Sequence, residues 1–341
     1  MDVLIIGGTR YMGKVTVEWL LARGDRVTVF SRGSTRPYWW DQVTHIYGDR
    51  NDRPDFSSKL KGRPFDAVID TQAYKWEDVE SAVRTLRGNV GRYLLVSTSS
   101  VYLEGKVDFF HRCPYNEADV DWSQLEYTYP LGEDPYAVGK RHCEKWLMEN
   151  GDIPYTIIRI PAVMGPDDPT GRMWWWVQRA LDGGRLVIPT NSLGAFRTLY
   201  YADAAINFLR VMDAPQAVNQ TYFIGMPEIM TIERWAYLVW QAAGNDLQIA
   251  YVPPEVIAKN NRLRNYSPPL SRPIPNIHDL SKANRDIGIT TTPVAEWVQE
   301  TVAWYRDSYR GPDSEGYRYR DEELSIALQW NQRYQQLVSE F

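Results

Sequence analysis

The residue pair best suited to chemistry is Tyr136 and Lys140, in the stretch "DPYAVGKRHCEKW". The pattern over 135–150 predicts a helix, so a spacing of four residues places both side chains on one face. An ammonium beside a phenol favours the phenolate form. Such a tyrosine exchanges a proton with an alcohol while hydride moves to or from a cofactor. The alternative is an ordinary aromatic–cation pair on a helix surface, because Tyr-x-x-x-Lys also arises by chance.

Hydroxyl side chains end a predicted strand upstream, in "YLLVSTSSVY". A Ser or Thr there is suited to hydrogen-bonding the substrate oxygen and holding it against Tyr136. The alternative is the turn chemistry common at strand ends.

The first residues, "MDVLIIGGTRYMG", predict a strand, a glycine loop and a helix. In that order the loop presents backbone N–H groups at a helix N-terminus, where a pyrophosphate binds. Gly7 permits the tight turn and Gly13 permits close packing of helix on strand. Arg10 stands where the usual fingerprint has its middle glycine.

The end of the second predicted strand, "VTVFSRGSTR", has Ser31 and Arg32 but no acidic residue. An NAD enzyme normally carries Asp or Glu there, whereas a guanidinium suits a 2′-phosphate. Together with Arg10, Arg32 therefore favours NADP, with NAD as the alternative cofactor. The other interpretation is that Arg10 is solvated and Arg32 flanks a turn. Asp49, in "YGDRND", is placed to meet the adenine edge.

The elements that must position these residues alternate along the chain. This alternation predicts an α/β fold of the Rossmann type, a doubly wound parallel sheet with a smaller C-terminal substrate domain. The predicted strands are 3–6, 27–30, 67–69, 93–96 and 155–160, and the predicted helices are 14–23, 77–86 and 135–150. The predicted organisation is an NAD(P)-binding domain (1–165), a substrate-binding region partly interleaved with it (166–310) and a helical C-terminal tail (311–341).

Seven short motifs, in this order, resemble the extended short-chain dehydrogenase/reductase family of the NAD-dependent epimerase/dehydratase type. They are "GGTRYMG", "GDRND", "VSTSSVY", "PYAVGK", "IIRIPAVMGP", "RTLYYADAA" and "DLSKANRDIGI", and the resemblance covers residues 1–310. The "GGTR" form resembles a divergent branch that includes chloroplast stem-loop-binding proteins.

The resemblance implies roles for particular residues. Tyr136 would be the general acid/base, Lys140 its activator and Thr98 the catalytic hydroxyl, with Asp203 in a structural strand-end motif. The implied cofactor-binding residues are Gly7, Thr9, Arg10, Tyr11, Met12, Gly13, Ser31, Arg32, Asp49, Arg50, Thr71, Gln72, Ala73, Pro161 and Val163. The implied substrate-binding residues are Ser99, Ser100, Trp175, Arg197 and Arg272.

Two departures from the family pattern bear on the reaction. Ser99 and Ser100 stand where sugar dehydratases carry an Asp-Glu pair, so we do not expect 4,6-dehydration. Ala162 stands where many sugar-nucleotide enzymes have an Asn.

The predicted function is an NAD(P)-dependent epimerase or oxidoreductase that transfers hydride at an alcohol or ketone carbon of a sugar or sugar nucleotide. The predicted partners are this small-molecule substrate and a second copy in a homodimer. The first alternative is an RNA-binding protein that keeps the fold, and the second is a cofactor-sensing regulator. The net charge of −5 argues against a general nucleic-acid binder, which would show a basic face.

No signal-peptide pattern or membrane-length apolar run is found, and Cys and His do not cluster at metal-ligand spacing. We therefore expect a cytoplasmic protein with reduced cysteines and no metal. For Trp39 and Trp40 we favour packing at an interface, whereas ligand stacking and interface packing are equally open for Trp174, Trp175 and Trp176. For the tail we expect its apolar residues to pack on the chain itself, with a partner as the alternative. They are Leu324, Ile326, Leu328 and Trp330.

Overall fold

The computed structural model describes residues 1–102, 113–123 and 125–341. The chain divides into two compact units. The first consists of Met1–Val163, Thr198–Pro227 and His278–Thr291, and the second of Met164–Arg197, Glu228–Ile277 and Thr292–Phe341. The units therefore exchange segments along the sequence, and the C-terminal residues belong to the second unit.

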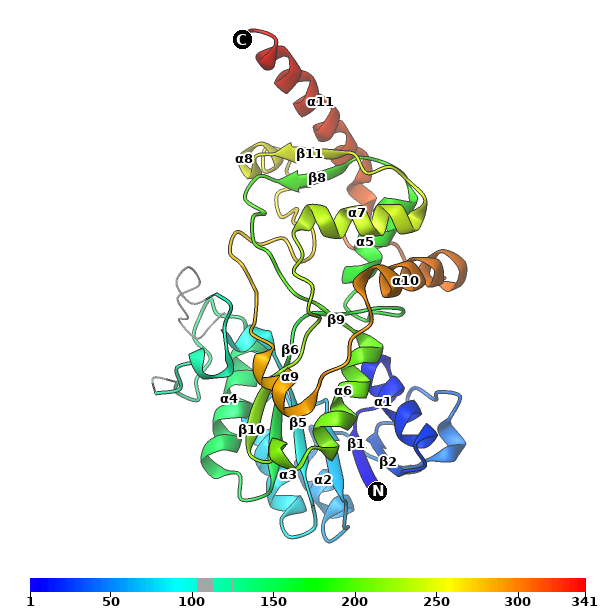
Figure 1. Ribbon diagram of the computed structural model, residues 1–341, viewed down its shortest axis with the longest axis vertical. Coiled ribbons are helices and arrows are strands. Elements are labelled where there is room, and N and C mark those ends of the chain that lie inside the picture. Colours follow the sequence, from blue (N-terminus) through cyan, green and yellow to red (C-terminus); the bar gives the residue numbers. More distant parts are fainter. Residues whose placement is uncertain (103–112, 124) are drawn as a thin grey trace. The chain divides into compact units, whose positions relative to one another are not determined.

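The first unit is built on a seven-stranded parallel sheet (Figure 1), in the order β10-β6-β5-β4-β1-β2-β3. This confirms the predicted Rossmann-type α/β fold. The strands are β1 (Asp2–Ile6), β2 (Arg26–Ser31), β3 (Thr44–Tyr47), β4 (Ala67–Asp70), β5 (Tyr93–Thr98), β6 (Tyr155–Ile160) and β10 (Gln220–Phe223). The helices are α1 (Tyr11–Ala22), α2 (Arg53–Leu60), α3 (Trp76–Leu86), α4 (Pro135–Asn150), α6 (Tyr201–Asp213) and α9 (Ser281–Ile287).

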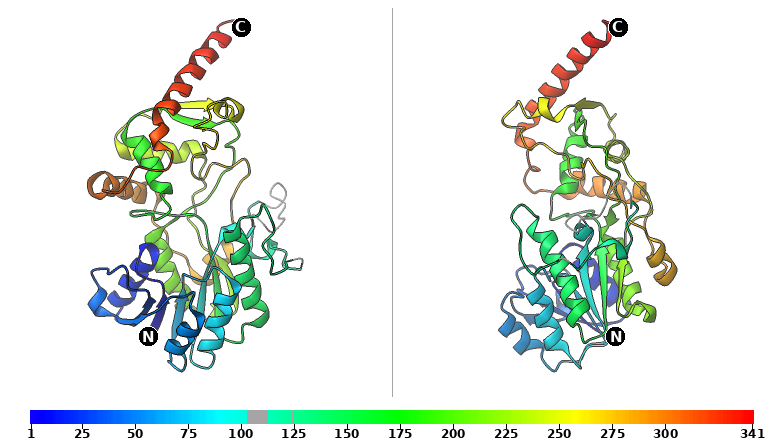
Figure 2. Two further views of the ribbon diagram at one scale, coloured as in Figure 1. Left: turned by 180° about the vertical axis from the view of Figure 1, so that it is seen from behind. Right: turned by 90° about the vertical axis from the view of Figure 1, so that its left-hand side faces the viewer.

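Side chains of β1 alternate between two hydrophobic cores, one on each face of the sheet. Val3 and Ile5 pack with residues of α1 and α6, whereas Leu4 and Ile6 pack with residues of α2, α3 and α4. Both faces are covered, so the strand is a continuous apolar run. Figure 2 shows the helices on either side of this sheet.

Helix α1 begins at Tyr11, three residues before the predicted start, because the glycine-containing turn leads directly into it. It ends as predicted: Gly24 follows the last turn with φ +86°, a conformation that glycine adopts without a Cβ clash.

The second unit holds a parallel strand pair, β8 and β11, with helices packed around it. Its elements are α5 (Arg172–Leu181), β8 (Leu186–Pro189), α7 (Ile232–Ala243), β11 (Ile249–Val252), α8 (Pro254–Ile257), α10 (Val294–Ser308) and α11 (Arg320–Val338). Two further short strands, β7 (Val163–Met164) and β9 (Leu199–Tyr200), pair with each other.

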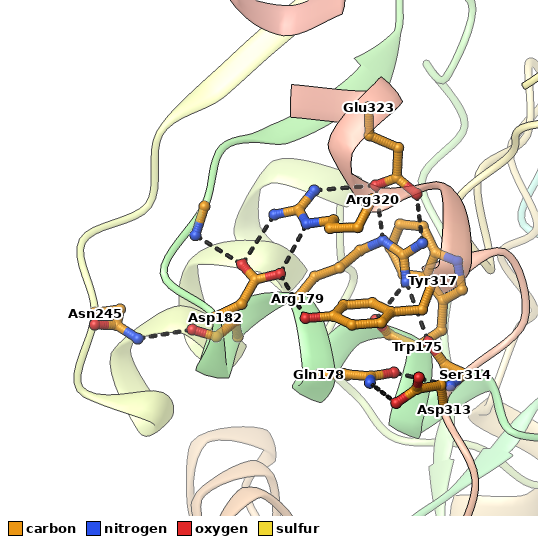
Figure 3. A network of polar contacts seen from close by, with 12 residues as sticks. Trp175, Gln178, Arg179, Asp182, Asn245, Asp313, Ser314, Tyr317, Arg320 and Glu323 are labelled. Atoms are coloured by element: carbon orange, nitrogen blue, oxygen red, sulfur yellow. Dashed lines mark hydrogen bonds and ion pairs between the residues drawn. The ribbon is translucent and has the colours of Figure 1, made fainter. Parts of the chain in front are cut away.

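A buried charge network fixes the start of α11 to α5 within the second unit (Figure 3). The Arg179 guanidinium donates from Nε to Glu323 at 3.0 Å, and Arg320 donates from Nη1 to the same carboxylate at 3.0 Å. Arg320 also donates from Nε to Asp182 at 2.8 Å. Removing one partner of such a network leaves a buried charge uncompensated, so these contacts hold the tail on its own chain.

The tryptophans serve mainly as packing within each unit. Trp39 is only 1% exposed and lies in the core on the α1 side of the sheet, so the interface predicted for it is wrong. Trp40 is also buried and stacks on His45 at 3.5 Å. Trp176 is fully buried, and Trp174 stacks on Tyr305 of α10.

None of the helices in the described ranges combines the length and the hydropathy needed to cross a membrane.

Candidate active site

The turn after β1 has the geometry of a dinucleotide loop. Gly7 and Gly8 have φ of +103° and +79°, and a Cβ on Gly7 would lie 2.5 Å from Thr71 Oγ1. A Cβ on Gly13 would lie 2.9 Å from the Cα of Gly8. The N-cap residue of α1 is Arg10, and its side chain makes no capping hydrogen bond in the described part of the chain. The first turn of α1 carries no acidic residue. The positive end of the helix dipole is therefore suited to a pyrophosphate, and the loop fits a dinucleotide.

We predict that Gly13→Ala weakens dinucleotide binding at least tenfold, since the new methyl meets the backbone of Gly8 and the loop must open. Titration calorimetry with NAD and NADP would measure this. Gly24→Ala is the control, because nothing lies within 4 Å of the new Cβ and its only cost is backbone strain at a φ of +86°. Equal weakening in both variants, or none in Gly13→Ala, would contradict the role of the loop.

The residues after β4 close one side of this loop. Thr71 donates its hydroxyl to the carbonyl of Ile6 at 2.9 Å, and the Gln72 amide donates to Asp70 Oδ1 at 2.9 Å. Ala73 is buried. Arg50 is also buried, and its Nη2 lies 3.2 Å from Asp70. The Arg50 side chain therefore forms an ion pair inside the first unit.

The residues after β2 and β3 lie close together in the same unit. Arg10 donates from Nε to Thr35 at 2.9 Å, and Ser31 accepts from the Gly33 amide at 3.3 Å. Hydrogen bonds from Asn51 and, to a lesser extent, the positive charge of Arg32 hold the pKa of Asp49 below its usual range. Arg32 itself is exposed. The structure thus leaves the Arg32 guanidinium accessible at the place predicted for the adenosine end of a cofactor.

Lys140 lies beneath the carboxyl end of β5. Its ammonium is buried and donates to the carbonyl of Val96 at 2.7 Å. Thr98 ends the strand, and its Oγ1 accepts from the Ser100 amide at 3.2 Å. Tyr136 lies in the first turn of α4, where its amide donates to the N-cap residue Asp134 at 3.0 Å, and its side chain is 43% exposed.

Tyr74 joins Lys140 and Tyr136 and was not predicted. The Lys140 ammonium lies 4.8 Å from the centre of the Tyr74 ring, and the Tyr74 and Tyr136 rings are 6.1 Å apart. Burial raises the pKa of Tyr74, although the positive charge of Lys140 opposes this. Gly139 lets α4 approach, because a Cβ there would lie 2.3 Å from the Tyr74 carbonyl oxygen. The one available signal was the position of Tyr74 at the end of "DTQAY", just after β4.

The remaining predicted residues divide between the units. Pro161 and Val163 follow β6 and are buried, as is Ser99 beside Thr98. In the second unit, Trp175 is buried against the Arg179 guanidinium, 3.8 Å from its ring centre. Arg272 lines a cavity of about 210 Å³, whose other lining residues include Arg264 and Tyr266. Arg197 is the last residue of its segment of the second unit.

A known protein family matches the part of the chain that holds the glycine loop and the Lys140 cluster. The model of the NAD dependent epimerase/dehydratase family matches residues 3–225. The chain belongs to this family. Two solved structures are matched over nearly their whole length.

The enzyme WbmH of Bordetella bronchiseptica, solved in complex with NAD⁺, is 20% identical, with a TM-score of 0.66 over 90% of this chain and 99% of that chain. The UDP-glucose 4-epimerase of Thermotoga maritima, solved with UDP-glucose, is 20% identical, with a TM-score of 0.69 over 90% of this chain and 99% of that chain. These likenesses show the fold.

A curated relative is the chloroplast stem-loop binding protein of 41 kDa b of Arabidopsis thaliana. It is 26% identical over 271 residues, which are 76% of this chain and 66% of the relative. The match thus spans slightly less than two thirds of the relative's own length.

Proposed function

We propose that the protein is an NAD(P)-dependent epimerase or oxidoreductase that acts at an alcohol or ketone carbon of a sugar or sugar nucleotide. The observation that carries the proposal is the Lys140–Tyr74–Tyr136 cluster, in which Lys140 bonds to Val96, two residues before Thr98 on β5. It lies in the same unit as the glycine loop. The similar structures solved with NAD⁺ and with UDP-glucose support the choice of cofactor and substrate class.

In this proposal each residue has a task set by its position. The Tyr136 hydroxyl exchanges the proton of the substrate alcohol, and Thr98 holds the same oxygen by a hydrogen bond. Lys140, fixed by the Val96 carbonyl, holds its ammonium within this cluster, 4.8 Å from the Tyr74 ring centre. The glycine loop, with the residues after β2 and β4, holds the dinucleotide. When bound, that cofactor accepts or returns the hydride.

A panel of nucleotide sugars tests the proposal. Incubated with NAD or NADP and the protein, one member is expected to give either its epimer, detected by NMR, or a change in nicotinamide absorbance. Conversion of none of them, by a protein shown to bind the dinucleotide, would contradict the proposed substrate class.

We further propose NADP as the preferred cofactor, because the exposed Arg32 follows β2 where an acid would select NAD. Arg32→Ala is expected to weaken NADP binding about tenfold and to leave NAD binding within twofold. Fluorescence titration of both dinucleotides measures this, with exposed Arg84 on α3 as the site of the matched control variant Arg84→Ala. An unchanged ratio of the two affinities in Arg32→Ala would contradict the preference.

A second candidate function is RNA binding, which the stem-loop-binding relative favours. An acidic chain with net charge −5 does not support it. Binding to a stem-loop RNA that weakens steeply with salt, in a protein that retains no dinucleotide, would favour this candidate over the enzyme.

A further inference from the structure

Helix α11 has two halves with different surroundings. In the first half, Arg320, Glu323 and Ala327 are buried within the second unit. In the second half and the turn after it, Tyr334 and Leu337 are each 54% exposed, and Val338 and Phe341 are also exposed. Figure 1 shows this half extending beyond the β8–β11 pair of its own unit.

The exposed half continues the face that is buried in the first half. Positions 320, 323, 327, 330, 334, 337 and 341 alternate in steps of three and four. Such spacing keeps side chains on one stripe of a helix that packs along another helix. We name Trp330, Tyr334, Leu337 and Phe341 the apolar stripe. Trp330 is partly buried against the hydrophobic core of the second unit, which includes Val187 and Val252. The stripe therefore begins at the edge of that unit.

We propose that the apolar stripe pairs with the apolar stripe of a second copy of this chain, antiparallel and about a two-fold axis. In an antiparallel helix pair of this spacing, Tyr334 lies opposite Leu337 of the second copy and Trp330 lies opposite Phe341 of the second copy. The two-fold axis repeats each contact, so one stripe complements itself. The proposal concerns assembly and goes beyond the proposed function.

The charges beside the stripe favour this occupant and this direction. Arg333 on α11 and Glu340 in the turn that continues it each directly precede a stripe residue, and the Glu340 amide still donates to the Leu337 carbonyl at 3.2 Å, so the two charges lie along one edge of the stripe. Antiparallel pairing brings Arg333 against Glu340 of the second copy, twice by symmetry. Parallel pairing would instead place Arg333 against Val338, with no charge to meet it. Both residues are exposed, and neither forms an ion pair within the described part of the chain.

The size of the contact sets its strength. The helical part of the overlap, residues 330–338, is about 14 Å long, which is small for a stable dimer. The first half of α11 is already anchored by Glu323 and Arg320, so the helix need not form on association. We therefore expect a weak, reversible association that depends on protein concentration.

Sedimentation velocity over a concentration series tests the proposal with charge-exchange variants of the full chain. Arg333→Glu and Glu340→Arg are each expected to weaken the association about tenfold, since two attractive pairs become repulsive. The double variant R333E/E340R is expected to restore it. Gln332→Glu, on the face of α11 opposite the apolar stripe, is the control and should associate as the parent does.

Restoration in the double variant distinguishes pairing of α11 from association through any other face. Circular dichroism checks that each variant is folded. We expect all of them to fold, because the substituted side chains are exposed. A parent protein that stays monomeric at every concentration, or single variants that associate as tightly as the parent, would overturn the proposal. So would a double variant as weak as the single ones.

Discussion

Replacing Tyr136 by Phe is expected to reduce turnover by about 10²- to 10⁴-fold while dinucleotide affinity stays within about twofold. The substitution removes only the hydroxyl that exchanges the proton. The ring remains against Tyr74, 6.1 Å between centres, so the start of α4 is unchanged. Steady-state kinetics on the converted substrate, with calorimetry of cofactor binding, measures the two effects separately.

A matched control is Tyr38→Phe, which removes a hydroxyl from an exposed tyrosine of the same unit. It is expected to turn over at the parent rate. Full activity in Tyr136→Phe would mean that another group performs the proton transfer, and Tyr74 would be the first to test because it contacts Lys140.

Replacing Glu144 by Ala is expected to lower the free energy of unfolding by about 3–5 kcal/mol. Glu144 lies one turn after Lys140 on α4 and is fully buried with Arg159 of β6. The guanidinium donates from Nε and Nη2 to Glu144 Oε2 at 3.1 and 2.8 Å, and Ser97 also donates to the carboxylate. Burial opposes the charge on Arg159, but the carboxylate outweighs burial and raises its pKa. Without Glu144 that charge stays buried and unpaired.

Urea denaturation followed by fluorescence measures the loss. Glu149→Ala is the control on the same helix, because the Glu149 side chain is half exposed and its 3.6 Å contact with Lys145 is therefore partly solvated. It is expected to change stability by less than about 1 kcal/mol. A similarly small change in Glu144→Ala would show that the pair does not hold α4 against the sheet.

The sequence was sufficient to predict the fold because the central strands are buried on both faces. Their continuous apolar runs, as in Val3–Ile6, stand out without any partner in view. The predicted helix over 135–150 also coincides with α4. The start of α1 was missed because its first turn carries the glycine-loop residues, which have no helical apolar pattern.

Long-range contacts set the limits of the site prediction. Tyr74 contacts Lys140 because α3 and α4 cover the same face of the sheet. No local sequence pattern indicates this contact. From the sequence, Arg50 could have been available to a cofactor. In the structure its side chain is buried and forms an ion pair with Asp70. The roles of Thr98, Tyr136, Lys140 and the loop residues remain predictions, since their placement is compatible with the proposed chemistry but does not test it.

The most direct test of the central claim is native mass spectrometry of the purified protein, before and after incubation with equal amounts of NAD and NADP. We expect one nicotinamide dinucleotide bound per chain, with NADP exceeding NAD. A protein that binds neither dinucleotide would contradict the proposed function.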